Sequence, residues 1–381
     1  MAIGGMRVPR DRWRQLRLAE KREARGLGRK GKVYRGWDAF NSAHAPVRNP
    51  TYKGKLRGKF KGRKIIDVPS RLDCSTAEDW STLSELLHTI RTAALQSRFR
   101  RVVLNFYEVE SLAPEAAVAL VAEIQRCRAF CNERTEITGT YPALHDVAAL
   151  LCDVGFFKAL GVKEPVRPKQ YAPRTYVQIE RRNTSTPETA DDLLDCFSEV
   201  FQFDPPDRKR LYVALVESMD NVFEHAYPAG SAAPHFMREW WLLGYADRVQ
   251  NTVGFTFYDQ GAGIPATIRS RQKDRVRSRL AGWSDGDWIS RAVSKGVSRH
   301  KSKRRGHGLH NLKEFIGRLD PQIDGSLQVL ANCGLVTFTS KGSKDVSKIT
   351  KELYGTLVVW KLRGFEVNVP DVSDGEQADA A

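Results

Sequence analysis

The sequence predicts an α/β protein of two folded domains behind a basic arm, and three observations support this. From Lys64 onward, short apolar runs rich in Val and Ile alternate with longer segments whose apolar residues recur at helical spacing. A proline-containing stretch at 162–175 lacks periodicity, as linkers do. Residues 1–63 carry 19 Lys and Arg against four Asp and Glu, with little apolar pattern. We therefore divide the chain into an arm (1–63), a first domain (64–161), a linker (162–175), a second domain (176–366) and an acidic tail (367–381).

The first domain reads as strands and helices in alternation. KIIDVP (64–69), Arg101–Val109 and TEITGT (135–140) have the composition of strands. Helices are expected over Ala77–Gln96, from Pro114 onward and over Ala143–Leu160, and proline is tolerated at a helix start. This βαβα order predicts a small mixed or parallel sheet with right-handed crossovers.

The second domain predicts a mixed sheet with helices on one face. Strands are expected at 174–181, Trp240–Tyr245, Val253–Tyr258, 335–342 and 355–362. Helices are expected at Glu188–Phe203, Leu211–Pro228, Ile289–Val297 and Leu309–Leu319.

The Leu211–Pro228 helix carries the most informative polar residues. Glu217, Asn221 and His225 recur at i, i+4 and i+8, so a helix places them on one stripe. A carboxylate and an amide oxygen one turn apart can hold a water and a hard cation, which suits Mg²⁺ brought in with phosphates. The alternative is a hydrogen-bonded helix face without chemistry.

Three later segments add ligand-binding features. A strand delivers Asp259 into a turn where Gly261 and Gly263 permit positive φ and close ligand approach. The stretch RRGHGLHNLKEFIG (304–317) is a glycine turn that opens a helix, whose free N–H groups suit phosphate. GTLVVWKL (355–362) is a terminal strand that begins Gly-Thr.

These four segments, in this order, resemble the N, G1, G2 and G3 boxes of the GHKL ATPases, the family shared by gyrase, Hsp90, histidine kinases and MutL. ESMDNVFEHAYP together with DQGAGIP is most similar to the anti-sigma-factor serine kinases. The resemblance covers about 190 residues, roughly half of the chain, and implies an α/β sandwich with a Bergerat-type ATP site and bound Mg²⁺.

The resemblance also implies a role for each site residue. Asn221 would bind Mg²⁺, and Glu217 would be the catalytic base. Asp259 would accept the adenine amino group, and Thr356 would reach the same base through water. The phosphates would lie against Gly306, Gly308 and the backbone of Leu309. Several basic residues are candidates for the γ-phosphate: Arg299, Lys301, Lys303, Arg304 and Arg305.

The first domain is similar in layout to the STAS domain of anti-anti-sigma factors. In that family, a serine after the second long strand accepts phosphate. Ala113, Pro114, Glu115 and Ala116 stand at those positions here, so the acceptor is missing and Ser111 lies too early. We expect Glu115 to supply a fixed negative charge that faces the basic segment 299–305.

The resemblance, taken with the charge distribution, leaves two function classes open besides a passive nucleotide-binding scaffold. A regulatory ATP switch or serine kinase would act on a protein partner, of the sigma-factor type or another. A nucleic-acid-associated ATPase would use the arm, which supplies +15 of the net +16, and segment 264–305 with 13 basic and three acidic residues, to hold RNA or DNA. The alternative for the arm is a solvated, disordered leader.

The remaining expectations concern the setting of the protein. No apolar run approaches the 18 residues of a membrane span, so we expect a cytoplasmic protein without a membrane partner. The six cysteines lack CxxC spacing, which favours buried free thiols. Oligomeric state stays open, a homodimer included.

Overall fold

A computed structural model provides the structure. It describes residues 64–95, 101–130, 136–165, 174–182, 187–198, 203, 205–225, 239–247, 250–269, 282–295, 308–319 and 321–364. The predictions for the basic arm, the acidic tail and segment 299–305 lie outside the described residues.

The part of the chain from 64 to 165 forms a three-stranded parallel sheet with helices. Strands β1 (Lys64–Asp67), β3 (Arg101–Asn105) and β5 (Glu136–Gly139) pair in the order β1-β3-β5, and β2 (Arg71–Leu72) pairs with β4 (Ser111–Leu112). Helices α4 (Ala77–Leu95) and α5 (Pro114–Phe130) are the crossovers. The predicted parallel βαβα order is confirmed.

Two local predictions in this part were wrong. The single helix expected over 143–160 divides into α6 (His145–Asp153) and α7 (Phe156–Ala159), because Gly155 takes φ 73° between them. The strand expected to reach Val109 ends at Asn105. There the Asn105 side chain accepts a hydrogen bond from Tyr107 N, which favours a turn.

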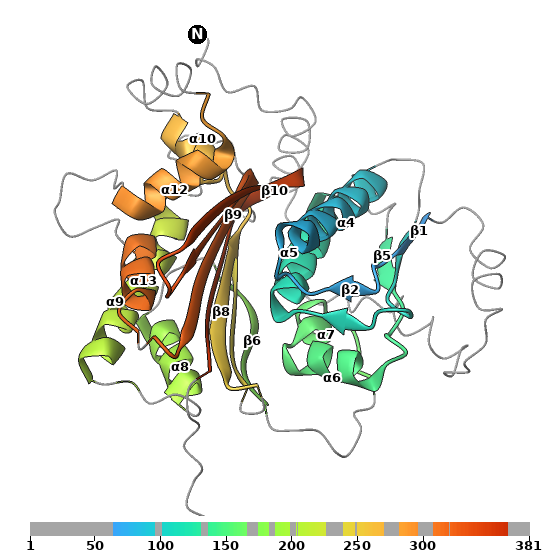
Figure 1. Ribbon diagram of the computed structural model, residues 1–381. Coiled ribbons are helices and arrows are strands. Elements are labelled where there is room, and N and C mark those ends of the chain that lie inside the picture. The colour runs from blue at the N-terminus through green and yellow to red at the C-terminus, as the bar shows by residue number, and fades with distance from the viewer. Residues whose placement is uncertain are drawn as a thin grey trace, which may run out of the picture.

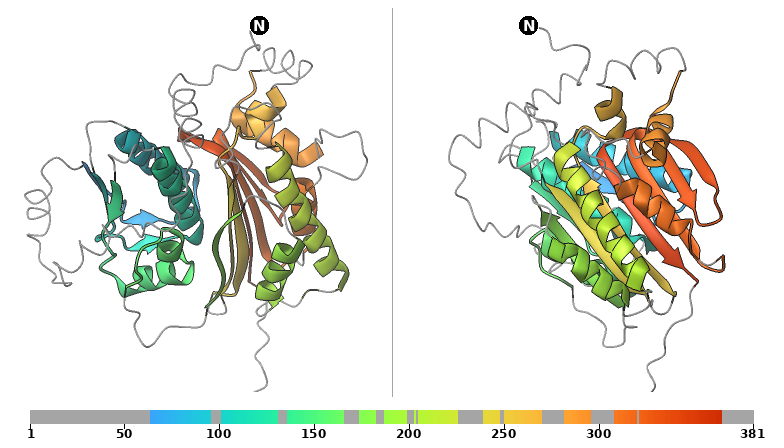
Figure 2. Two further views of the ribbon diagram at one scale, coloured as in Figure 1. Left: turned by 180° about the vertical axis from the view of Figure 1, so that it is seen from behind. Right: turned by 90° about the vertical axis from the view of Figure 1, so that its left-hand side faces the viewer.

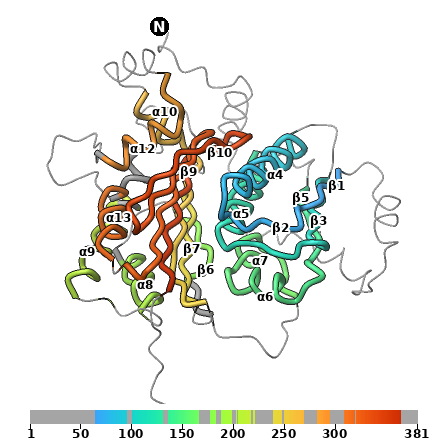
Figure 3. The backbone as a smooth tube through the Cα atoms, viewed as in Figure 1, coloured from blue at the N-terminus to red at the C-terminus, as the bar shows by residue number. Residues whose placement is uncertain are grey.

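The second part is built on a five-stranded sheet of order β6-β7-β8-β10-β9. Its strands are β6 (Arg174–Arg182), β7 (Trp240–Asp247), β8 (Thr252–Asp259), β9 (Asp324–Thr339) and β10 (Lys344–Arg363). All four neighbouring pairs are antiparallel, so the expected mixed sheet was wrong. The smoothed backbone of Figure 3 shows these strands running side by side.

The helices that accompany this sheet in the described ranges are α8 (Pro187–Ser198), α9 (Pro205–His225), α10 (Ile264–Arg269), α12 (Asp285–Lys295) and α13 (Gly308–Ile316). The α8 helix ends before Phe203, where the sequence pattern had extended it. The α9 helix begins at Pro205 rather than Leu211, since proline is tolerated in a first turn.

Strand β9 reverses direction within its length. Ser340 N donates to Gly325 O over 2.8 Å, although a straight strand would separate these residues by roughly 50 Å. Asn332, with φ 56°, lies midway between them and marks the turn. Because β10 pairs with both halves of β9, it also reverses, and its register shifts between Lys348 and Thr356. The sequence had predicted only parts of these two strands.

Helices cover both faces of the large sheet, not one face as the sequence predicted (Figure 1). Side chains alternate between the two sides along β10: Val358 and Trp360 pack in the core formed with α8, α9, α12 and α13, whereas Leu357 and Val359 pack in the core formed with α4 and α5. The side view in Figure 2 shows α9 and α13 lying along the sheet. Burial on both faces explains why the central strands are apolar almost throughout.

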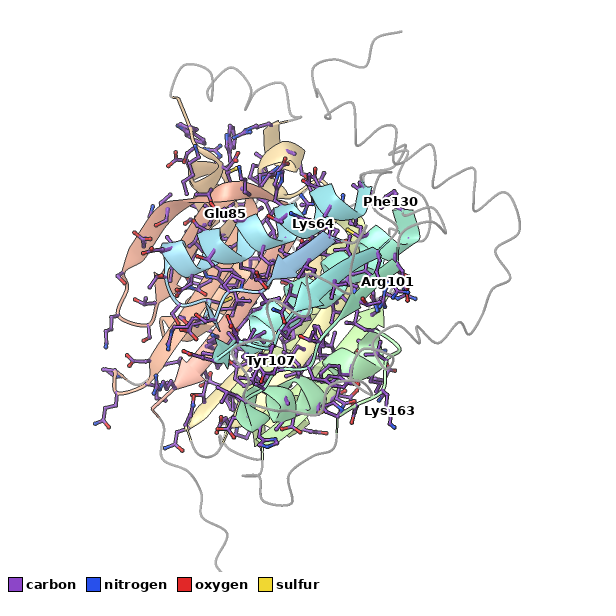
Figure 4. The ribbon with its side chains drawn as sticks, turned by 90° about the vertical axis from the view of Figure 1, so that its right-hand side faces the viewer. Lys64, Glu85, Arg101, Tyr107, Phe130 and Lys163 are labelled. Carbon is purple, nitrogen blue, oxygen red and sulfur yellow. The ribbon has the colours of Figure 1, made fainter. Side chains whose placement is uncertain are left out.

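The first part of the chain is joined to the large sheet by polar contacts as well. Trp241 Nε1 donates to Gln125 Oε1 over 2.8 Å, and Ile179 N donates to Val154 O over 2.8 Å. Lys351 N donates to Ser84 Oγ over 3.2 Å where α4, which carries Glu85, passes in front of β9 and β10 (Figure 4). The two parts of the chain therefore share the hydrophobic core on this face of the large sheet.

None of the helices in the described ranges is long and apolar enough to cross a membrane.

Candidate functional site

Asp259 and Thr356 lie directly opposite each other on neighbouring strands. They are partners in the antiparallel register of β8 and β10, and both are buried. Alternation along the strands places them on the same face as Phe257 and Val358, which belong to the core beneath α9 and α13. The structure thus brings together two residues that are 97 positions apart in the sequence.

At the turn after Asp259, the neighbouring chain segments lie so close together that a side chain would not fit between them. Gly261 N donates to Asp259 Oδ1 over 2.8 Å, which is the turn-capping role expected of an aspartate before glycine. Gly263 takes φ 78°, and a Cβ there would lie 2.7 Å from Asn332 Oδ1. Gly355 takes φ 84°, and a Cβ there would lie 1.9 Å from Asp259 O. Glycines therefore permit the close approach of β8, β9 and β10 at this site.

Glu217 projects from α9 toward α13. Asn311 Nδ2 donates to Glu217 Oε2 over 2.9 Å, and both side chains are part-buried. This contact joins the helix expected to carry the metal and base residues to the helix expected to hold phosphate. Asn221 lies one turn further along α9, and its side chain is outside the described residues.

The predicted phosphate loop is described only at its end. Helix α13 begins at Gly308, and Leu309 packs against the core shared with α9. Gly306 and the five basic candidates for the γ-phosphate lie outside the described residues. The short α10 helix and α12, both inside the basic segment 264–305, are joined by an ion pair of 2.5 Å between Arg269 and Asp285.

No protein-family model, curated protein or solved structure matches this chain.

The sequence had predicted that Glu115 is a charge facing the basic segment 299–305, which lies outside the described residues; the structure instead buries Glu115 against β10. Its side chain is fully buried, and its Oε1 lies 2.5 Å from Lys361 Nζ of β10. Burial by itself lowers the pKa of Lys361, but the Glu115 carboxylate, together with the nearby Tyr245 and Cys74 side chains, outweighs this and raises the pKa. Lys361 lines a cleft of about 1160 Å³ together with Ser111 and Arg363, at the end of the sheet opposite Asp259. Glu115 is therefore part of the interface between the two parts of the chain.

Several residues of the site region escaped the sequence analysis. Asn311 lies in segment 304–317, which the sequence analysis had already proposed to hold phosphate. Its position in the same helix, two residues after Leu309, could have identified it as a site residue. Asn332 had no signal, because its role depends on the turn in β9. Burial was predicted for all six thiols: Cys74, Cys127, Cys152 and Cys196 are buried free thiols, Cys333 is half-buried, and Cys131 lies outside the described residues.

The residues present suit an adenine nucleotide. The Asp259 carboxylate accepts a hydrogen bond from Gly261 N, and a carboxylate is the acceptor chemistry that an amino group requires. Asn332 Oδ1, which lies against the glycine turn, is a buried polar atom without a hydrogen-bond partner among the described residues. A ligand that donates a hydrogen bond there would reduce the energetic cost of such an atom.

Proposed function

We propose that this protein is a Mg-ATP-binding regulatory protein of the GHKL type, similar to an anti-sigma-factor serine kinase with a fused STAS-like module. The observation that supports it best is the pairing of Asp259 with Thr356 on the face of the sheet that α9 and α13 cover, beside a turn that accommodates only glycine. On this proposal the second part has the GHKL fold and the first part the STAS-like fold.

In the proposed site, each residue has a physical role. Asp259 would accept the adenine amino group, because a buried carboxylate pairs strongly with a buried donor. Mg²⁺, when bound, would neutralise phosphate charge, and the Asn221 amide would be its protein ligand. Glu217, oriented by Asn311, would accept a proton from an attacking water or hydroxyl.

The proposal can be tested by following where the γ-phosphate of ATP goes when ATP is added to the purified full-length protein. We would follow phosphate release and protein phosphorylation from labelled ATP, with and without RNA or DNA, and use Asp259→Asn as the matched control. Transfer to a protein partner, lost in the variant, supports the kinase-like switch. Turnover stimulated by nucleic acid would favour the nucleic-acid-associated ATPase instead, and no binding of ATP at all would refute both.

A further inference from the structure

A buried ionic cluster lies on the face of the large sheet opposite the candidate nucleotide site. Arg91 of α4 and Glu123 of α5 form two parallel hydrogen bonds of 2.8 Å, and their side chains are 8% and 0% exposed. Burial by itself raises the pKa of Glu123, but Arg91 and Arg126 outweigh it, so the pKa lies below its usual value. Buried ion pairs are poor stabilisers compared with apolar packing, and a role in specifying geometry is the better-attested use.

This cluster holds an aromatic ring of the large sheet. The Arg91 guanidinium lies 3.8 Å from the centre of the Tyr354 ring, and the Arg126 guanidinium lies 4.2 Å from it. Both arginines are almost fully buried. The electrostatic attraction between a cation and the face of an aromatic ring is strongest when the cation is desolvated, as both arginines are here. Two charged groups from the α4–α5 layer therefore fix one tyrosine of β10.

Tyr354 stands directly before the residues that approach Asp259. Gly355 follows it, and its backbone lies so close to Asp259 O that no Cβ fits between them. Thr356 comes next and pairs with Asp259 in register. A displacement of the Tyr354 ring would thus move Gly355 and change the separation of the two proposed adenine contacts.

The same ionic cluster also lies close to β8, the strand that carries Asp259. Tyr258, the residue before Asp259, is fully buried on the α4–α5 side. Its burial, together with the nearby Glu123 carboxylate, raises the pKa of its hydroxyl. Tyr258 directly precedes Asp259 in β8, and Tyr354 lies two residues before Thr356 in β10, so each strand has a tyrosine close to this cluster on the opposite face.

We propose that the α4–α5 layer sets the affinity of the nucleotide site by holding Tyr354 between its buried charges, so that Tyr354 and Arg126 are positioning residues for Asp259 and Thr356. This inference rests on the proposed function. Coupling between two sites is reciprocal, so a bound nucleotide stabilises the docking of α4 and α5 by the same free energy. A partner that contacts the first part of the chain would then alter nucleotide binding through this cluster.

The test uses three full-length variants. Tyr354→Leu removes the ring, Arg126→Met removes one cation and leaves the Arg91–Glu123 pair, and Tyr354→Phe keeps the ring. Calorimetry measures Mg-ATP affinity, and hydrogen exchange measures protection of the backbone at 259–264. We expect the first two variants to bind at least about fivefold more weakly, the lower end of typical couplings, and to exchange faster over 259–264. Tyr354→Phe should match the parent in both measurements.

The double variant Glu115→Gln/Lys361→Met is the matched control. It perturbs the same interface at the far end of the sheet and should leave nucleotide affinity and exchange over 259–264 unchanged. Parental affinity and exchange in both Tyr354→Leu and Arg126→Met would overturn the coupling, and so would an equal effect in the control. If the parent binds no nucleotide, the proposed function fails, while the exchange measurement still decides whether the cluster orders this turn.

Discussion

Replacing Gly355 with alanine tests the close contact on which the candidate site depends. Gly355 has φ 84°, and an added Cβ would lie 1.9 Å from Asp259 O and 2.6 Å from Gln260 Cα. Both are backbone atoms, so no side chain can rotate away. The ends of β8 and β10 would have to separate, and Asp259 and Thr356 would move apart with them.

The size of the effect follows from two contributions. Left-handed backbone costs alanine about 1–2 kcal/mol, and overpacking typically adds about 1–3 kcal/mol, so we expect roughly 2–5 kcal/mol of destabilisation. Gly342 supplies the matched control, since its φ is 77° but an added Cβ would meet nothing within 4 Å. Gly342→Ala should therefore cost only the backbone contribution of about 1–2 kcal/mol.

Urea unfolding followed by circular dichroism measures both variants against the parent. Gly355→Ala should lower the midpoint distinctly more than Gly342→Ala, and it should also weaken binding of Mg-ATP. Equal midpoints for the two variants would show that the close approach of Gly355 to Asp259 carries no energetic weight, and the geometric argument for the site would fail.

Three further outcomes are expected. Glu217→Ala should retain Mg-ATP, because binding depends mainly on Asp259 and the glycines, but should lose turnover; hydrolysis at the parental rate would exclude Glu217 as the base. Because the folded-state pKa of Glu123 lies below its unfolded value of 4.5, its stabilisation is present above that pH and is lost as pH falls further. The parent should therefore have a lower urea midpoint at about pH 4 than at about pH 6, and this difference should be smaller in Glu123→Gln. A difference of the same size in both proteins would contradict the buried ion pair. Lys361→Met leaves the buried Glu115 carboxylate without its cation and should cost roughly 3–5 kcal/mol by urea unfolding, whereas Glu115→Gln/Lys361→Met should recover much of this loss.

The sequence predicted helices and strands well where the apolar residues followed a single periodicity. The parallel βαβα order from Lys64 to Leu160 and most helices of the second part follow directly from apolar spacing. The 143–160 helix was wrong because Gly155 breaks it with a positive φ, and helical periodicity on both sides concealed that break. The reversal of β9 and β10 was missed because strand patterning carries no information about direction, and the turn depends on positive φ at Asn332.

The covering of both sheet faces could not be predicted from local pattern. A central strand such as β7 is buried throughout, and a continuous apolar run does not say what packs on each side. Glu115 illustrates the same limit: as an isolated acidic residue near a helix start it suggested an exposed charge, yet its position in the interface pairs it with Lys361, which is 246 residues later. For the candidate site, the sequence supplied Asp259, Thr356 and Glu217 from motifs, whereas Asn311 and Tyr354 emerged only from contacts across the fold.

The most direct test of the account compares ATP with inosine triphosphate by calorimetry in the presence of Mg²⁺. Inosine carries an oxygen where adenine carries the amino group, so Asp259 would face an acceptor rather than a donor. We expect the parent to bind ATP at least roughly ten- to a hundredfold more tightly, the value of one hydrogen bond to a charged group, and Asp259→Asn to lose this preference. Equal affinity of the parent for the two nucleotides would contradict the assignment of Asp259 as the adenine-binding carboxylate.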